Sequence, residues 1–173
     1  WYRFKNFPEE YDCWWGVKTL PEVEENCPSY RDFIIEDKNS VVAQWIRRGS
    51  SGWRLDVADE LPDDFIIALR KRVKAENPDA AVLGEVWEDA SNKVAYGQLR
   101  SYALGHSLDS AMNYPLRNAL LNFFTGKGTS EDFARTVRSL HENYPPQMFY
   151  ALMNLVGSHD RARVLNVLAG LSG

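Results

Sequence analysis

Three carboxylates in this sequence follow short apolar stretches that we predict to be strands. Asp56 lies near the end of the stretch 52–57, Glu85 ends the stretch 80–85, and Asp160 follows the last apolar run of the chain. Parallel strands of an α/β barrel bring their carboxyl ends to one face, and such barrels place their reactive groups there. We therefore expect the three side chains to converge, and we take them as the candidate catalytic residues.

Arg54 and the neighbouring residues suggest different protonation states for Asp56 and Glu85. Arg54 lies two residues before Asp56, so the alternation of side chains along a strand puts both on one face. A guanidinium lowers the pKa of an adjacent carboxyl, whereas nearby negative charge and the flanking Val86 and Trp87 should raise the pKa of Glu85. One ionised and one protonated carboxyl, about 5–5.5 Å apart, is the pairing that retaining glycosidases use as nucleophile and as acid, then base.

Each of these residues taken alone has a simpler explanation. A single Asp after a strand is more often a helix N-cap than a nucleophile. His159, in the loop before Asp160, would usually be bonded to the backbone. Arg54 could be only a structural ion-pair partner of Asp56. The occurrence of three carboxylates at equivalent places in one repeating pattern is what favours a catalytic site.

A recurring order of strand and helix, which begins near residue 38, must position these side chains. Alternation of this kind implies parallel strands in an α/β fold. Helices are predicted at 40–48 with Ser40 as N-cap, from Pro62 to before Pro78, from Pro115 to Gly126, from Ser130 to Pro145, and over 161–169 as a closing helix that begins there. Strands are predicted at 52–57, 80–85, 107–112 and 148–156, although the last run is also long enough for a buried helix.

The composition is that of an ordinary globular domain. The chain has 173 residues, of which 45% are hydrophobic and 25% charged, and this excludes disorder. A complete eight-stranded α/β barrel usually needs about 250 residues. The predicted fold is therefore a partial (β/α)8 TIM barrel, approximately strands four to seven with their helices.

Several classes of protein are disfavoured by charge and hydropathy. The net charge is −4 and the basic residues are scattered, which argues against a nucleic-acid partner. The longest apolar run, 65–69, is far shorter than the roughly 18 residues that a membrane span requires, and no signal-peptide pattern is present. Because the chain begins with Trp1 we expect an excised or processed piece, so both a cytoplasmic and a secreted origin stay open. Cys13 and Cys27 lack metal-site spacing, and we expect free thiols.

Three segments resemble, in the right order, the second, third and fourth signature regions of the α-amylase family. They are residues 52–60 (GWRLDVADE), 84–87 (GEVW) and 157–160 (GSHD). Residues 20–24 (LPEVE) resemble the additional signature near the end of the domain that this family inserts after its third barrel strand. The resemblance covers nearly the whole chain, and its motifs together are specific.

This resemblance implies a domain organisation and a role for each matched residue. Residues 1–37 would be an irregular segment at the end of the inserted domain, and 38–173 the central part of the catalytic barrel. The protein would cleave α-1,4-linked glucans such as maltodextrins, cyclodextrins or pullulan by double displacement. The implied roles are nucleophile for Asp56, general acid/base for Glu85, transition-state stabiliser for Asp160, and substrate binding for Arg54, His159, Glu60 and Trp87.

Finer features point to a subgroup and also depart from it. Residues 57–60 (VADE) are close to the Val-Ala-Asn-Glu ending typical of neopullulanases, cyclomaltodextrinases and maltogenic amylases, and 109–115 (DSAMNYP) resembles the sixth-strand segment of that group. Asp59 and Glu24 replace the usual Asn at their positions. The family's first signature, whose Asn often supports calcium, is absent. No cofactor is therefore identifiable in this chain, and calcium stays open for an intact parent.

Two other hypotheses follow from the same residues. The isolated chain could be an inactive half-barrel or a weak glucan-binding module, because an opened barrel leaves strand edges and an apolar interior that favour oligomers or aggregation. Alternatively, Asp56, Glu85 and Asp160 could bind magnesium, as in enolase-like barrels. Arg54 would compete with such a metal ion, and no lysine base is suitably placed.

Overall fold

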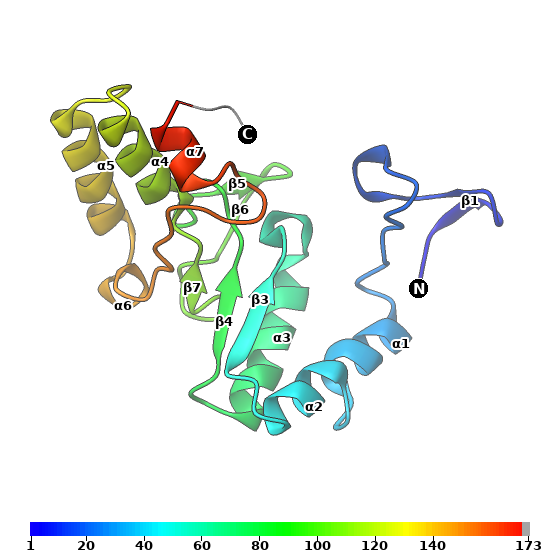
Figure 1. Ribbon diagram of the computed structural model, residues 1–173. Helices are drawn as coiled ribbons and strands as arrows, with labels where there is room; N and C mark the ends of the chain where they lie inside the picture. Colours follow the sequence, from blue (N-terminus) through cyan, green and yellow to red (C-terminus); the bar gives the residue numbers. More distant parts are fainter. Residues whose placement is uncertain (171–173) are drawn as a thin grey trace.

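The computed structural model describes residues 1–170, and its centre is a short parallel sheet (Figure 1). The sheet has the order β3-β4-β7, with β3 (Gly52–Leu55), β4 (Ala81–Gly84) and β7 (Ser110–Ala111). β3 and β4 pair in parallel, in register from Gly52 opposite Ala81 to Leu55 opposite Gly84. Within the described residues β4 is the only neighbour of β3, so one edge of the sheet is open there. This is part of a barrel wall rather than a closed barrel.

Helices cover the sheet, and all but α6 were predicted, in the same order. The helices of the barrel region are α2 (Val41–Arg47), α3 (Asp63–Glu76), α4 (Tyr114–Phe124), α5 (Ser130–Asn143), α6 (Pro146–Phe149) and α7 (Val164–Leu168). Ser40 caps α2 as predicted, since its hydroxyl accepts a hydrogen bond from the Ala43 N–H. One face of α3 is buried and packs into the same core as Val82 of β4. The amphipathic pattern of α3 thus places the helix beside the strand ends that carry the site.

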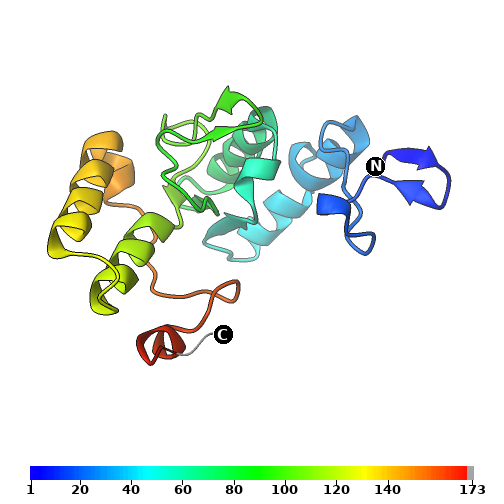
Figure 2. The same cartoon turned by 90° about the horizontal axis from the view of Figure 1, so that it is seen from above.

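Residues 1–37 contain more regular structure than the sequence predicted. They form an antiparallel hairpin of β1 (Phe4–Asn6) and β2 (Glu10–Tyr11), a 3-10 turn (Trp14–Gly16), and α1 (Pro28–Arg31), which continues as a π-helical stretch (Asp32–Glu36). The hairpin and α5 lie at opposite ends of the molecule (Figure 2). These elements are too short to show a hydrophobic period of their own in the sequence. The sequence of residues 1–37 therefore predicted an irregular segment.

The strand predicted over 148–156 is wrong. The start of that run belongs to α6, because Pro146 fits the first turn of a helix, where the missing N–H costs nothing. Only Met153 continues the sheet, through a parallel bridge to Met112. The strand predicted over 107–112 is shorter than expected, and is reduced to β7 and that bridge.

The side chain of Asp109 adds to the strand pairing just before β7, where the Asp109 N–H also donates to the Val82 carbonyl at 2.9 Å. One of its carboxylate oxygens accepts the Val82 N–H at 2.8 Å and lies 2.9 Å from Lys74 Nζ, and the other accepts a 2.8 Å hydrogen bond from Arg70. This network joins α3, β4 and the segment before β7. It fixes the approach of β7 to the sheet.

A two-stranded hairpin projects from the connection between β4 and β7. It consists of β5 (Val94–Ala95) and β6 (Gln98–Leu99). Among residues 1–170, none of the helices combines the length and the apolarity needed to cross a bilayer. Cys13 and Cys27 are free thiols, as predicted.

Candidate active site

Asp56 and Glu85 come together because they follow paired strands at the same register. Leu55 and Gly84, the last residues of β3 and β4, are partners across the sheet, and each carboxylate comes one position later. The ladder continues past the strand ends, since the Glu85 N–H donates to the Leu55 carbonyl at 2.9 Å. The two side chains therefore leave the same edge of the sheet, as the sequence predicted for the carboxyl ends of parallel strands.

Arg54 contacts both of these carboxylates. Its Nη1 donates to Asp56 Oδ1, and its Nη2 lies 3.1 Å from Glu85 Oε2. The sequence predicted the pairing with Asp56 correctly, but it did not predict that the same guanidinium also faces Glu85. Both carboxyl groups must accordingly lie within reach of one planar cation. The Asp56 side chain is 72% exposed and that of Glu85 is 2% exposed, so the two acids differ strongly in access to solvent.

Glu85 is held at both oxygens by neighbouring donors. The Val57 N–H donates to Oε2 at 2.9 Å, and the Trp87 indole N–H donates to Oε1 at 2.9 Å. Val57 has a φ of +40°, which is rare for a β-branched residue and costs about 1–3 kcal/mol. Such strain is typical of functional sites. Here it occurs at the residue whose N–H binds Glu85.

Trp87 is in turn clamped by residues that the sequence analysis did not single out as functional. The Arg161 guanidinium lies 3.7 Å from the centroid of the Trp87 ring, and the Tyr114 ring lies 5.6 Å away on a tilted plane. The Tyr114 hydroxyl bonds to Ser158 Oγ at 3.0 Å. The loop 157–163 is thereby tied to the end of β4. The only sequence signal for Arg161 was its position directly after Asp160.

Asp160 belongs to that loop and lies near the ends of β3 and β4. Its own N–H donates to Ser158 Oγ at 3.2 Å, which fixes the start of the turn. His159 Nε2 lies 3.2 Å from Asp160 Oδ2, while the His159 ring is largely exposed. The structure thus pairs the two residues with each other and brings Asp160, together with Asp56 and Glu85, into one cavity.

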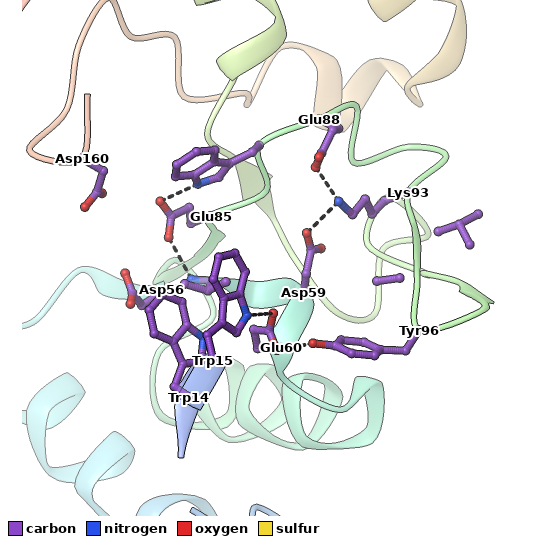
Figure 3. Close-up of a pocket in the computed structure, with 14 residues that line it drawn as sticks. Trp14, Trp15, Asp56, Asp59, Glu60, Glu85, Glu88, Lys93, Tyr96 and Asp160 are labelled. Carbon is purple, nitrogen blue, oxygen red and sulfur yellow. Dashed lines mark hydrogen bonds and ion pairs between the residues drawn. The ribbon is translucent and has the colours of Figure 1, made fainter. Parts of the chain in front are cut away.

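The cavity has a volume of about 490 Å³ and joins segments from both halves of the chain (Figure 3). Five of the predicted site residues line it, namely Asp56, Glu60, Glu85, Trp87 and Asp160. The sequence analysis missed other lining residues, among them Trp14, Trp15, Lys93 and Tyr96. Trp14 and Trp15 come from the N-terminal turn, whereas Lys93 and Tyr96 come from the connection that carries β5 and β6. No spacing in the sequence links these segments to the strand ends.

Lys93 partly balances the negative charge of the cavity. Its Nζ lies 3.0 Å from Asp59 Oδ2 and also bonds to Glu88. Burial disfavours the charged amine, but the hydrogen bonds and the charges of Glu88 and Asp59 outweigh it and raise the pKa of Lys93. Asp59, which replaces the family's usual Asn, is therefore engaged in an ion pair with a stable cation.

The site does not resemble a metal centre. Among residues 1–170 no three or more His, Cys, Asp or Glu side chains are grouped so that they could hold a metal ion. The Arg54 guanidinium occupies the position between Asp56 and Glu85 that a magnesium ion bound by both would need. This geometry counts against the magnesium hypothesis.

α/β-barrel proteins build their active sites at the carboxyl ends of their strands. This chain forms part of such a barrel, and its acidic groups converge at that end. Residues 1–172 match the family described as alpha amylase, catalytic domain. The chain belongs to the α-amylase family. The resemblance that the motifs predicted is confirmed.

Relatives and solved structures agree with this assignment. An amylopullulanase of Thermoanaerobacterium saccharolyticum is 35% identical over 190 residues, which cover 96% of this chain and 14% of the relative. A cyclomaltodextrinase of Geobacillus thermopakistaniensis (strain MAS1) is 34% identical over 178 residues, 98% of this chain and 28% of the relative. The ligand-free cyclic alpha-maltosyl-(1→6)-maltose hydrolase from Arthrobacter globiformis has a TM-score of 0.87 at 28% identity, and the match covers 98% of this chain and 37% of that one. The chain thus spans only a part of each relative.

Proposed function

We propose that the protein containing this chain is a retaining glycoside hydrolase that cleaves α-1,4-glucosidic bonds in maltodextrins, cyclodextrins or pullulan. The observation that carries the proposal is the single guanidinium of Arg54 in contact with both Asp56 and Glu85. A guanidinium that contacts both keeps the two carboxyl groups near each other, and double displacement needs them about 5–5.5 Å apart. The names of relatives such as cyclomaltodextrinase and neopullulanase support this class of substrate.

In this mechanism the exposed carboxylate of Asp56 attacks the anomeric carbon from inside the cavity. Glu85 gives its proton to the departing glycosidic oxygen, and a covalent glycosyl ester with Asp56 forms. Glu85 then takes a proton from water, which attacks the anomeric carbon and releases Asp56. The Trp87 and Val57 N–H groups hold the Glu85 carboxyl in place throughout.

The remaining site residues bind the sugar that carries the developing positive charge. Asp160 accepts hydrogen bonds from its secondary hydroxyls, and the negative charge there stabilises the oxocarbenium-like transition state. His159, paired with Asp160, donates to the same sugar. Glu60 and the Trp87 ring line the cavity.

We also propose that residues 1–37 are the end of an inserted domain and that 38–173 are the central part of the catalytic barrel. The hairpin β1–β2 and the following turn lie outside the parallel sheet, which supports the division. The last positions, 171–173, lie outside the described residues. The chain alone would then be an inactive half-barrel, and its open β3 edge would favour oligomers. A compact monomer in sedimentation velocity would contradict this last expectation.

Hydrolysis of maltodextrin by the intact protein tests the assignment. We expect Asp56→Asn and Glu85→Gln each to lower turnover by several orders of magnitude, since each removes one half of the two-step chemistry. Asp79→Asn and Glu131→Gln change exposed carboxylates outside this cavity and serve as matched controls. Near-normal hydrolysis by either site variant would refute the catalytic roles. A parallel assay of the purified 173-residue chain tests whether the piece is active alone.

A further inference from the structure

Arg161 directly follows Asp160, yet its side chain packs outside the cavity. Asp160 lines the cavity, whereas Arg161 is not among the lining residues. The Cζ atom of Arg161 lies 3.7 Å from the centroid of the Trp87 ring and 5.8 Å from that of Tyr114. A side chain in this position does not meet a sugar bound in the cavity. Any part that Arg161 takes in the reaction must therefore act through a neighbouring residue.

The contact with Trp87 is what explains the position of the Arg161 guanidinium. Its Nε is buried and, among the described residues, has no hydrogen-bond partner, which is costly for a charged group. Arg117 is also buried nearby, and desolvation followed by the positive charge of Arg161 lowers the pKa of Arg117. Attraction between a cation and the face of an indole offsets these costs, and it strengthens where water is excluded.

The ring beneath Arg161 is the one that binds the proposed general acid. The Trp87 indole N–H donates to Glu85 Oε1 at 2.9 Å, and the Glu85 side chain is almost fully buried. A cation over an indole draws electron density from the ring, and polar contacts polarise one another in this way where the dielectric is low. The N–H becomes a stronger donor, which favours the ionised form of the carboxyl that accepts it.

We propose that Arg161 is a positioning residue for Glu85, which acts through Trp87 and couples the loop of Asp160 to the general acid. The proposal rests on the proposed function and adds to it a residue that governs how Glu85 is oriented and how readily it releases its proton. Because Asp160 and Arg161 are consecutive, a shift of the loop that moves the transition-state stabiliser also moves the cation over Trp87.

Tyr114 fixes this arrangement from a third element. It is the first residue of α4 and is fully buried, and its ring packs at 5.6 Å from that of Trp87. Its hydroxyl bonds to Ser158 Oγ at 3.0 Å, three positions before Arg161. The loop, the end of β4 and the start of α4 therefore meet at one aromatic contact.

Other charged groups also face Glu85, and they stay in place when Arg161 is changed. Arg54 of β3 lies 3.1 Å from Glu85 Oε2, and Asp56 and Asp160 line the same cavity. The remaining charged side chains of the cavity are those of Asp59, Glu60, Glu88 and Lys93. A shift of the pH profile in an Arg161 variant is therefore due to the loss of Arg161 itself.

Hydrolysis of maltohexaose by the intact protein, measured as a function of pH, tests the proposal. Arg161→Met keeps a side chain of similar length without the charge, and it should lower kcat roughly tenfold at nearly unchanged KM. The basic limb of the kcat/KM profile reports the loss of the proton from the acid. This limb should move up by about half a pH unit, because the ionised form of Glu85 loses stabilisation. Arg161→Lys keeps a cation over the ring and should restore most of kcat and the original limb.

Two further variants isolate the route through the indole. Arg138→Met is the matched control, because Arg138 is an exposed arginine of α5 that does not line this cavity, and its kinetics should equal those of the unmodified protein. Trp87→Phe keeps a ring but lacks the N–H. In that background Arg161→Met should not move the basic limb any further. A shift that persists there would show a direct effect of charge and would overturn the route through Trp87.

The outcomes separate this proposal from the proposed function. If the unmodified protein cleaves maltohexaose but Arg161→Met matches Arg138→Met in kcat and pH profile, the role of Arg161 is overturned and the glycosidase assignment stands. A higher KM at unchanged kcat would overturn it too, since that indicates direct contact with sugar. So would a fall in kcat that Arg161→Lys shares and that leaves the basic limb in place, since this indicates a purely structural role. If the unmodified protein does not cleave maltooligosaccharides, the proposed function fails and the role of Arg161 fails with it.

Discussion

Replacing Arg54 by lysine is the sharpest test of the geometry at the strand ends. The guanidinium offers separate nitrogens to Asp56 and Glu85. A lysine ammonium is a single point charge on a flexible chain and cannot occupy both positions at once. The variant therefore keeps the positive charge but loses one of the two contacts. It tests the bridge itself, and not merely the presence of a cation.

The size of the effect follows from the burial of the two partners. The contact with Asp56 is worth at most about 1 kcal/mol, because that carboxylate is mostly exposed and solvent screens the pair. The contact with Glu85 is a 3.1 Å ion pair with a carboxylate that is almost fully buried, and removal of one partner of a buried pair costs about 3–5 kcal/mol, of which lysine, by keeping the charge, restores a part. We expect a loss of about 2 kcal/mol. Expressed in the barrier to glycosyl transfer, this is roughly a 30-fold fall in kcat.

Two measurements on the intact protein check this expectation. Turnover of maltodextrin should fall by about 30-fold, and the midpoint of urea unfolding, followed by near-UV circular dichroism, should move to lower urea. Arg135→Lys is the matched control, because Arg135 is an exposed arginine whose ion pair with Asp132 contributes little. If Arg54→Lys behaves like Arg135→Lys in both assays, the guanidinium does not bridge the carboxylates and the reasoning is wrong.

Two further predictions concern the sheet that supports the site. Gly52→Ala should lower the free energy of unfolding by about 3 kcal/mol or more, since a Cβ would lie 2.1 Å from the Ala81 carbonyl oxygen of the neighbouring strand. Gly84→Ala should lower it less, because its Cβ meets a methyl group of Leu108 that can rotate away. Urea titrations that give the reverse order would contradict this. Burial raises the pKa of Asp109, but hydrogen bonds from Lys74 and other donors outweigh it and lower the folded value. Its stabilising contribution is therefore present above the unfolded pKa of about 3.9 and is lost as the pH falls through the folded pKa. Asp109→Asn should destabilise the protein at pH 7 and progressively less as the pH falls below about 3.9, and an effect that does not shrink on acidification would refute the network.

The sequence by itself determined the parts of this protein that follow local rules. The period of apolar residues marked β3, α3 and β4, because a strand or helix shows its buried face at a fixed spacing. The pairing of Arg54 with Asp56 followed from alternation along one strand. The convergence of Asp56 and Glu85 followed from the parallel order, since equal register puts consecutive strand ends side by side.

Only the tertiary structure decided how distant loops meet around those strand ends. Local spacing could not choose between helix and strand for 148–156, where α6 and a single bridge at Met153 replaced the predicted strand. Nor could it join Trp15 and Tyr96 to Glu60, from which they are 45 and 36 positions distant. Neither contact repeats with any period, because each depends on where two irregular connections settle after the helices and strands have packed. The pairing of Asp56 with Glu85 is encoded locally, whereas the shape of the pocket around them is a property of the whole fold.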